Sequence, residues 1–208
     1  MKSLGRKFCR LPAFIATLGM MTIARGFALL YTGGKPVSQF TEGMMFIGSK
    51  VGIVPVPVIV YAIMIAITWV LLGYTTSFGK NVYAIGGNIK AAEISGVNVK
   101  KNLVLIYGFA GLCSAVAAIV FAGRVGSVHP GAAMGYELTA IAATTIGGTS
   151  HYGGIGTIWG AVIGALVLGV LRNGLTLLGI DAYWQQIIEG MIIIVAVVID
   201  MRKNARKK

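Results

Sequence analysis

The chain has 208 residues, of which 56% are hydrophobic and 12% are charged, about half the charged share of soluble domains. A soluble domain of this size needs more polar surface, and a disordered chain is richer in charge, so the composition argues against both classes. The net charge of +12 would suggest nucleic-acid binding in a soluble protein, but here the basic residues lie beside long apolar stretches. We therefore expect a polytopic membrane protein that is surrounded by the lipid bilayer and has no nucleic-acid partner.

The lysines and arginines form three clusters, at residues 1–10, between Lys80 and Lys101, and at residues 202–208. Basic clusters of this kind are typical of the cytoplasmic loops of membrane proteins. We expect residues 1–10 to be a basic cytoplasmic N-terminus and 202–208 a basic cytoplasmic tail. The membrane domain would then cover residues 11–201 and include a cytoplasmic loop at 73–102.

Five apolar stretches are long enough for a helix to cross about 30 Å of hydrocarbon. They are residues 11–30, 51–72, 103–122, 154–171 and 183–199. Region 134–152 is different, because it is apolar for only nine residues, Leu138 to Ile146, and is followed by glycine pairs. With both termini cytoplasmic the number of crossings must be even, so this region is expected to cross as a short helix extended by glycine-rich backbone. The predicted fold is an all-α transmembrane helix bundle of about six membrane segments, one of them short or broken around 134–152.

Residues that could carry out chemistry are few and scattered. His129 and His151 lie in separate polar stretches without metal-ligand spacing, and Cys9 and Cys113 have different surroundings. We expect no catalytic residues, no metal site and no cofactor, and therefore not an enzyme.

Two acids, Glu137 and Glu189, lie near the ends of apolar stretches. An acid inside a membrane indicates a functional site by default, whereas a solvated or helix-capping carboxylate is the alternative. Gly160 and Gly164 form a small-xxx-small pattern, which allows two membrane helices to approach closely. We expect these glycines to pack within the bundle.

The loop at 73–102 is the longest polar segment and gives the strongest local signal. Gly86-Gly87-Asn88 is typical of a turn, and Asn88 can cap a short helix from Ile89 to Ser95 that stops at Gly96. Ala91 and Ala92 are expected on the surface of that helix. Two interpretations remain open at this point: a helix that only connects two spans, and a knob that docks into a partner's cleft.

The stretch from Phe78 to Val97 resembles the cytoplasmic loop of sugar-type ABC importer permeases, the membrane subunits of ribose and galactoside uptake systems. The resemblance covers about residues 11–201 in consistent order. The other matching segments are Pro12–Gly19, Ala24–Gly26, Tyr136–Thr149, Gly153–Thr157, Asn173–Leu177 and Tyr183–Gly190.

The resemblance implies a multi-pass protein of the bacterial plasma (inner) membrane. Such permeases pair with a second permease copy and sit on cytoplasmic ABC ATPase subunits, and a periplasmic or lipid-anchored sugar-binding protein delivers the substrate. ATP would be bound and hydrolysed by the partner. The short loop helix would be the coupling helix that docks on the ATPase, with a set of residues drawn from the turn and the helix: Gly86, Gly87, Asn88, Ala91, Ala92, Ser95 and Gly96.

Three residues are candidates for the substrate pathway: Glu137, Trp184 and Gln185. Aromatic rings and amides suit hydroxyl-rich ligands, but a tryptophan at the end of a span is also a common interfacial anchor. Family members usually begin with several further membrane helices before the segment that matches Pro12, so this chain resembles the C-terminal two-thirds of a permease. The alternative function is therefore a truncated, non-transporting membrane fragment of such a permease.

Overall fold

The computed structural model describes residues 13–73, 76–150 and 153–205. The predicted segment 1–10, His151 and residues 206–208 of the predicted tail lie outside these ranges. The described part contains nine helices and four two-residue strands, which confirms the predicted all-α class. In chain order the elements are α1 (Ala13–Thr32), β1 (Val37–Ser38), α2 (Glu42–Gly48), β2 (Lys50–Val51), β3 (Val54–Pro55), α3 (Val56–Leu72), α4 (Ser77–Gly87), α5 (Ile89–Ile94), α6 (Val99–Val125), β4 (Ser127–Val128), α7 (Tyr136–Ile146), α8 (Ile158–Leu177) and α9 (Ala182–Ala205).

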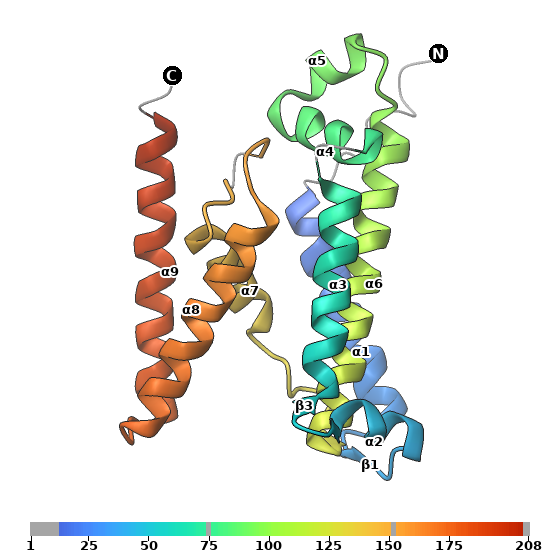
Figure 1. Cartoon of the computed structure of the whole chain (residues 1–208), viewed down its shortest axis with the longest axis vertical. Helices are drawn as coiled ribbons and strands as arrows, with labels where there is room; N and C mark the ends of the chain where they lie inside the picture. The colour runs from blue at the N-terminus through green and yellow to red at the C-terminus, as the bar shows by residue number, and fades with distance from the viewer. Residues whose placement is uncertain (1–12, 74–75, 151–152, 206–208) are drawn as a thin grey trace.

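The long helices alternate in direction. Within the described ranges, α1, α6 and α8 are long and apolar enough to cross a membrane, α9 is apolar over Ala182–Val198, and α3 continues into α4 through a 74° bend. In Figure 1, α1, α6 and α8 run toward the lower end, and α3, α7 and α9 run toward the upper end. The elements α4 and α5 lie at the upper end, and so does the end of α9. This arrangement agrees with the predicted bundle of about six membrane segments.

The short segment of the prediction is α7. Its 11 residues span about 16 Å at 1.5 Å per residue, only about half of the hydrocarbon thickness. It ends at Gly147, and Gly148 adopts a left-handed conformation with φ +85°, so the helix cannot continue. Backbone before and after α7 supplies the remaining length between the two ends of the molecule (Figure 1).

The predicted start of the second span is wrong. The second span was expected to begin at residue 51, but α3 begins at Val56, and residues 50–55 form the β2–β3 hairpin instead. Gly52 has φ +63°, which fits a tight turn. Pro57 lies in the first turn of α3, where the backbone nitrogen has no hydrogen-bond acceptor within the helix and proline is therefore tolerated. The hairpin pairs Lys50 with Pro55 and keeps residues 50–55 outside the helix.

Two segments that were expected as loops pair at the lower end of the molecule. Strand β1 runs antiparallel to β4, with Val37 opposite Val128, and so joins the segment after α1 to the segment after α6. Helix α2 was not predicted, and it packs on the last turns of α6 where Gly48 meets Gly123. A Cβ on Gly48 would strike the Gly123 carbonyl oxygen and a Cβ on Gly123 would strike the Met44 carbonyl oxygen, so only glycines permit this close approach.

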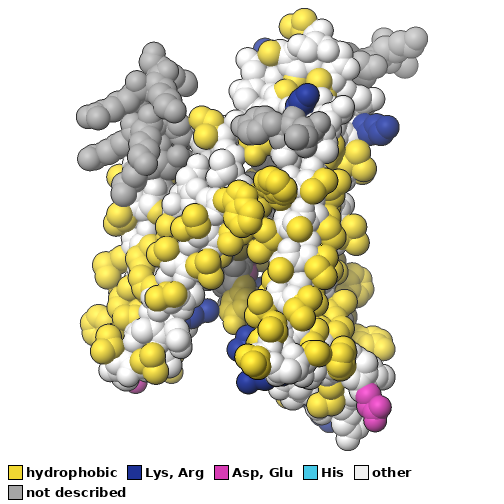
Figure 2. Space-filling model, in the orientation of Figure 1, with side chains coloured by type: hydrophobic (Ala, Val, Ile, Leu, Met, Phe, Trp, Pro, Cys, Tyr) yellow, Lys and Arg dark blue, Asp and Glu magenta, His cyan; other side chains and the backbone are white. Residues whose placement is uncertain are grey.

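The helices form two groups, which we call the α3 group (α1, α2, α3 and α6) and the α8 group (α7, α8 and α9). Figure 1 shows the two groups side by side, and Figure 2 shows hydrophobic side chains covering the sides of both. Exposure of large apolar side chains such as Val170 (73%) and Ile194 (65%) would be costly in water and fits a lipid-facing surface. The buried clusters are accordingly small, and one of them, Ala142, Ala143 and Leu168, joins α7 to α8.

Candidate functional site

The bent connection between α3 and α6 contains an unpredicted helix, α4. Thr76 caps it, because the Thr76 side chain accepts a hydrogen bond from the Gly79 nitrogen at 3.0 Å. The signal in the sequence was the helical spacing of Phe78, Val82 and Ile85. The prediction of a turn at Gly86-Gly87-Asn88 is therefore partly wrong, since both glycines end α4 and the chain changes direction only at Asn88.

Helix α5 was predicted from its caps, and the caps are confirmed. The Asn88 side-chain oxygen accepts a hydrogen bond from the Ala91 nitrogen at 3.1 Å. After Ser95, Gly96 takes the left-handed conformation with φ +84°, and the Val97 nitrogen donates to the Ala92 oxygen at 3.0 Å. Both ends of this six-residue helix are thus fixed by hydrogen bonds, and α5 presents a defined surface.

The expected exposure of Ala92 is wrong. Ala92 is 3% exposed because it faces Ile85 of α4 and Val99 of α6 in a small buried cluster. Ala91 is exposed as expected. The large exposed apolar side chains on α5 are Ile89 (52%) and Ile94 (88%). Neither was among the residues predicted for this surface.

The surroundings of α5 are basic. Lys80, Lys90, Lys100 and Lys101 are all exposed, and Glu93 is the acid that lies among them. Figure 2 shows hydrophobic and basic side chains together at this upper end, where the basic cluster between Lys80 and Lys101 predicted the cytoplasmic side.

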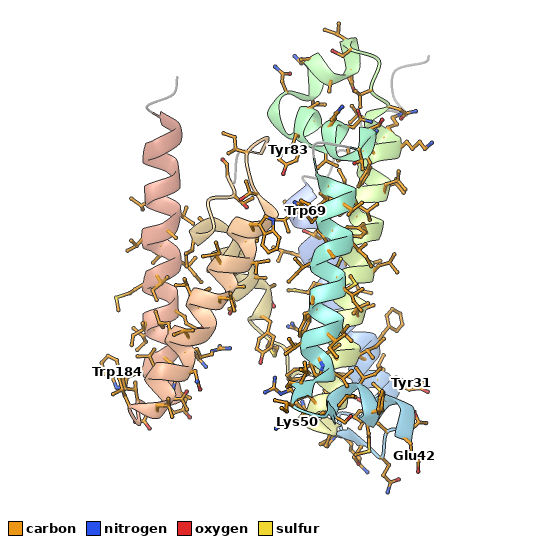
Figure 3. All side chains as sticks on the ribbon, in the orientation of Figure 1. Tyr31, Glu42, Lys50, Trp69, Tyr83 and Trp184 are labelled. Atoms are coloured by element: carbon orange, nitrogen blue, oxygen red, sulfur yellow. The ribbon has the colours of Figure 1, made fainter. Side chains whose placement is uncertain are left out.

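Helix α4 also contacts the segment that leads into α8. The Tyr83 hydroxyl donates a hydrogen bond to the Gly156 carbonyl oxygen at 2.9 Å, across 73 residues of sequence. Figure 3 shows Tyr83 beside α4 on the side that faces this segment. A Cβ on Gly86 would lie 2.6 Å from the Gly154 nitrogen, so the two backbones are in direct contact. The spacing of glycines alone could not predict this pairing.

A cavity of about 720 Å³ lies directly below this contact, between the α3 group and the α8 group. Its walls come from α3, α4, α6, α8 and the segment before α8. Most lining side chains are apolar, and hydroxyl groups are contributed by Tyr61, Thr68, Tyr83, Thr149 and Thr157. Figure 2 shows the two groups in contact in the upper half of the view and separated in the lower half.

The predicted pathway residues lie elsewhere. Trp184 is 60% exposed at the end of the molecule opposite α4 (Figure 3). The Gln185 side-chain nitrogen donates to the Ile180 oxygen at 2.8 Å and to the Thr176 hydroxyl at 3.3 Å, so it fastens the α8–α9 turn. Glu137 is exposed in the first turn of α7. These three residues are not among those that line the 720 Å³ cavity.

Among the described residues, no group of three His, Cys, Asp or Glu side chains is placed to hold a metal ion. Glu189, which the sequence marked as a possible intramembrane acid, is 17% exposed and paired with Arg172. The described part of the chain has an exposed basic loop around α5 and a cavity between the two helix groups.

The chain is similar to bacterial permeases. The sequence model of the family described as "Branched-chain amino acid transport system / permease component" matches residues 4–197. The chain is 46% identical to the ribose import permease protein RbsC of Bacillus subtilis (strain 168) over 200 residues, which are 94% of this chain and 62% of that protein. It is 45% identical to RbsC of Escherichia coli (strain K12) over 201 residues, with the same coverage.

A third relative is the galactose/methyl galactoside import permease protein MglC of Haemophilus influenzae, which is 43% identical over 212 residues. These residues are 97% of this chain and 62% of that protein. The chain thus spans about 62% of the length of the curated relatives that it matches. No solved structure matches the chain.

Proposed function

This chain belongs to the family of branched-chain amino acid transport system permease components, and from that premise we propose that it is a membrane-spanning subunit of an ATP-driven monosaccharide importer. The observation that carries the proposal is the 46% identity to a ribose import permease over 94% of this chain. The similarity to a galactose/methyl galactoside import permease extends the proposed substrate class to monosaccharides in general.

We propose that the upper end in Figure 1 is cytoplasmic and that loop 73–102 docks there on an ABC ATPase subunit. Three features support this: the exposed lysines, the capped helix α5, and the exposed Ile94. The expected coupling residues Gly87, Ala91 and Ser95 are exposed, whereas Ala92 would act only by supporting α5 from below. ATP would be bound and hydrolysed by the partner.

The other proposed partners are a second permease copy and a periplasmic or lipid-anchored sugar-binding protein, in a bacterial inner membrane.

We propose that the 720 Å³ cavity is one stretch of the pathway, because its hydroxyl groups can exchange hydrogen bonds with a sugar while its apolar walls contact the sugar's C–H faces. Glu137, Trp184 and Gln185 stay proposed pathway residues at the opposite side of the membrane. For them the measurement is uptake of labelled ribose and galactose by Glu137→Gln and Trp184→Ala.

Affinity purification of the tagged full chain from its own membranes tests the docking proposal. We expect an ABC ATPase, identified by its sequence and its ATP hydrolysis, to remain bound to the unaltered chain. Ile94→Glu should remove it, because burying a carboxylate in an apolar contact is costly. Ile53→Glu is the matched control, since Ile53 is 97% exposed at the opposite end of the molecule.

Loss of the ATPase from both variants, or from neither, would contradict docking at α5. A stable unaltered chain that binds no ATPase would instead support the alternative function, a non-transporting membrane fragment. Uptake of monosaccharides by the purified complex in vesicles is then the measurement of transport itself.

A further inference from the structure

The contact between α4 and the segment before α8 joins the proposed docking loop to the wall of the cavity. Its first component is the hydrogen bond from the Tyr83 hydroxyl to the Gly156 oxygen, at 2.9 Å. Gly156 directly precedes Thr157, whose side chain caps α8 by accepting a hydrogen bond from the Gly160 nitrogen at 3.1 Å. The bond from Tyr83 therefore ends one residue away from the start of α8.

The second component is backbone packing between glycines. A Cβ on Gly86 would come within 2.6 Å of the Gly154 nitrogen and 3.3 Å of its Cα, and a Cβ on Gly154 would come within 2.8 Å of the Gly87 Cα. Gly153 and Gly154 have φ +88° and +72°, which disfavours any other residue there. At these glycines the backbone of α4 contacts the backbone of the segment directly. Because protein interiors are closely packed, displacement of α4 should displace the segment as well.

Within the segment, backbone hydrogen bonds join the described residues on either side of positions 151–152. The Ser150 nitrogen donates to the Ile155 oxygen at 2.9 Å, and the Gly153 nitrogen donates to the Ser150 oxygen at 3.2 Å. Beyond it, α8 is a continuous 20-residue helix whose Ala161 and Ala165 line the cavity. Residues 153–157 run directly into the first turn of α8, which the Thr157 side chain caps.

The contact also lies at the point where the cavity walls meet. Tyr83 and Gly156 both line the cavity, with α3 and α6 forming one wall and α8 the other. Helix α4 follows α3 in the chain, so its contact with the segment before α8 sets the spacing of the two walls at their upper end. Without this contact, α8 could keep its position when α4 moved.

We propose that Tyr83 is a positioning residue that, together with Gly86, couples α4 to α8, so that displacement of α4 by a bound ATPase moves the α8 wall of the cavity. This inference rests on the proposed function, because the ATPase is the source of the displacement. For this effect neither Tyr83 nor Gly86 needs to touch the ATPase or the substrate.

The native thiol of Cys113 offers a direct measurement, because Cys113 lies on α6 in the cavity wall. In a Cys9→Ser background, the purified complex with its ATPase is reacted with N-ethylmaleimide, with and without ATP. In the unaltered complex we expect ATP to change the rate of labelling at Cys113 several-fold, because movement of α8 opens or closes the cavity. In Tyr83→Phe we expect bound, ATP-hydrolysing ATPase but the same labelling rate with and without ATP, and in Gly86→Ala we expect the ATP-dependent change in labelling to be lost.

Two matched controls separate this effect from general damage. Tyr107→Phe removes the same hydroxyl from an exposed tyrosine on α6, and Gly108→Ala adds the same methyl group where a Cβ meets nothing within 4 Å. Both controls should keep the ATP-dependent change in labelling. Tyr83→Phe removes one atom and adds none, so it tests the coupling even if Gly86→Ala reduces the yield of folded protein.

The outcomes are distinct for the two proposals. An unaltered chain without bound ATPase would count against the proposed function. With the ATPase bound, the coupling is overturned if ATP leaves the labelling of Cys113 unchanged in the unaltered complex, or if Tyr83→Phe and Gly86→Ala respond to ATP as the unaltered complex does. Loss of the ATPase from Tyr83→Phe would also overturn it, because Tyr83 would then serve docking and not transmission.

Discussion

Arg172 on α8 and Glu189 on α9 form a two-point ion pair, with 2.7 Å between Nε and Oε1 and 3.2 Å between Nη2 and Oε2. The Arg172 guanidinium also lies 5.8 Å from the centre of the Tyr136 ring, and Tyr136 meets Phe121 edge to face at 6.0 Å. One arginine therefore connects α7, α8 and α9, and through Tyr136 it reaches α6. Arg172 lies just beyond the predicted span 154–171, whereas in the structure it lies inside α8.

The ion pair should stabilise the α8–α9 hairpin. We expect Arg172→Met to lower the free energy of unfolding by about 1–2 kcal/mol, because Glu189 is mostly buried and loses its charged partner. The double variant Arg172→Met/Glu189→Met should lose less than Arg172→Met alone, since it leaves no unpaired charge. Thermal unfolding in detergent, followed by circular dichroism, measures both, and Asp181→Asn is the control at an exposed acid nearby. A double variant with a lower free energy of unfolding than Arg172→Met would contradict a destabilising effect of the unpaired carboxylate.

The α7–α8 crossing should depend on Gly164 and not on Gly169. A Cβ on Gly164 would strike the Ala143 oxygen and come within 2.9 Å of the Gly147 nitrogen, whereas a Cβ on Gly169 meets nothing within 4 Å. We expect Gly164→Ala to cost about 1–3 kcal/mol through overpacking. Gly169→Ala, in the same helix, should be neutral or stabilising by about 0.5–1 kcal/mol. Equal melting temperatures for the two variants would show that helix propensity alone governs these positions.

The Asn88 cap should control the opening of α5. Asn88→Ala removes the acceptor of the Ala91 nitrogen and should cost about 1 kcal/mol, or about fivefold in local opening. Hydrogen exchange of a peptide that covers α5 measures this, and Asn88→Asp should retain slow exchange because aspartate also caps. Unchanged exchange in Asn88→Ala would mean that the packing of Ala92 suffices to hold α5.

The proposed orientation can be tested with single cysteines in a Cys9→Ser/Cys113→Ala background. Lys90 and Glu42 are both exposed, and they lie at opposite ends of the molecule (Figures 1 and 3). An impermeant thiol reagent added to intact cells should label Glu42→Cys, and it should label Lys90→Cys only after the membrane is opened. The opposite pattern would reverse the orientation and remove the basis for docking at α5.

Features that depend on neighbours in sequence could be predicted. The Asn88 cap, the stop at Gly96 and the shortness of α7 rest on hydrogen bonds or on apolar runs within a few residues. The packing role of Gly160 and Gly164 was also predictable as a pattern, because a small-xxx-small spacing puts both glycines on one helix face. Their partners on α7, Gly147 and Ala143, were not.

The sequence by itself determined the class of the protein, the approximate spans and the polar loop, because hydropathy and capping are properties of short segments. Only the tertiary structure decided that Ala92 is buried and Ile94 exposed, that Arg172 pairs with Glu189, and that Tyr83 reaches Gly156. These facts depend on which distant segments are brought together, and the relevant residues lie up to 73 positions apart. Local periodicity contains no information on such contacts, because the free energy that selects them comes from packing between helices.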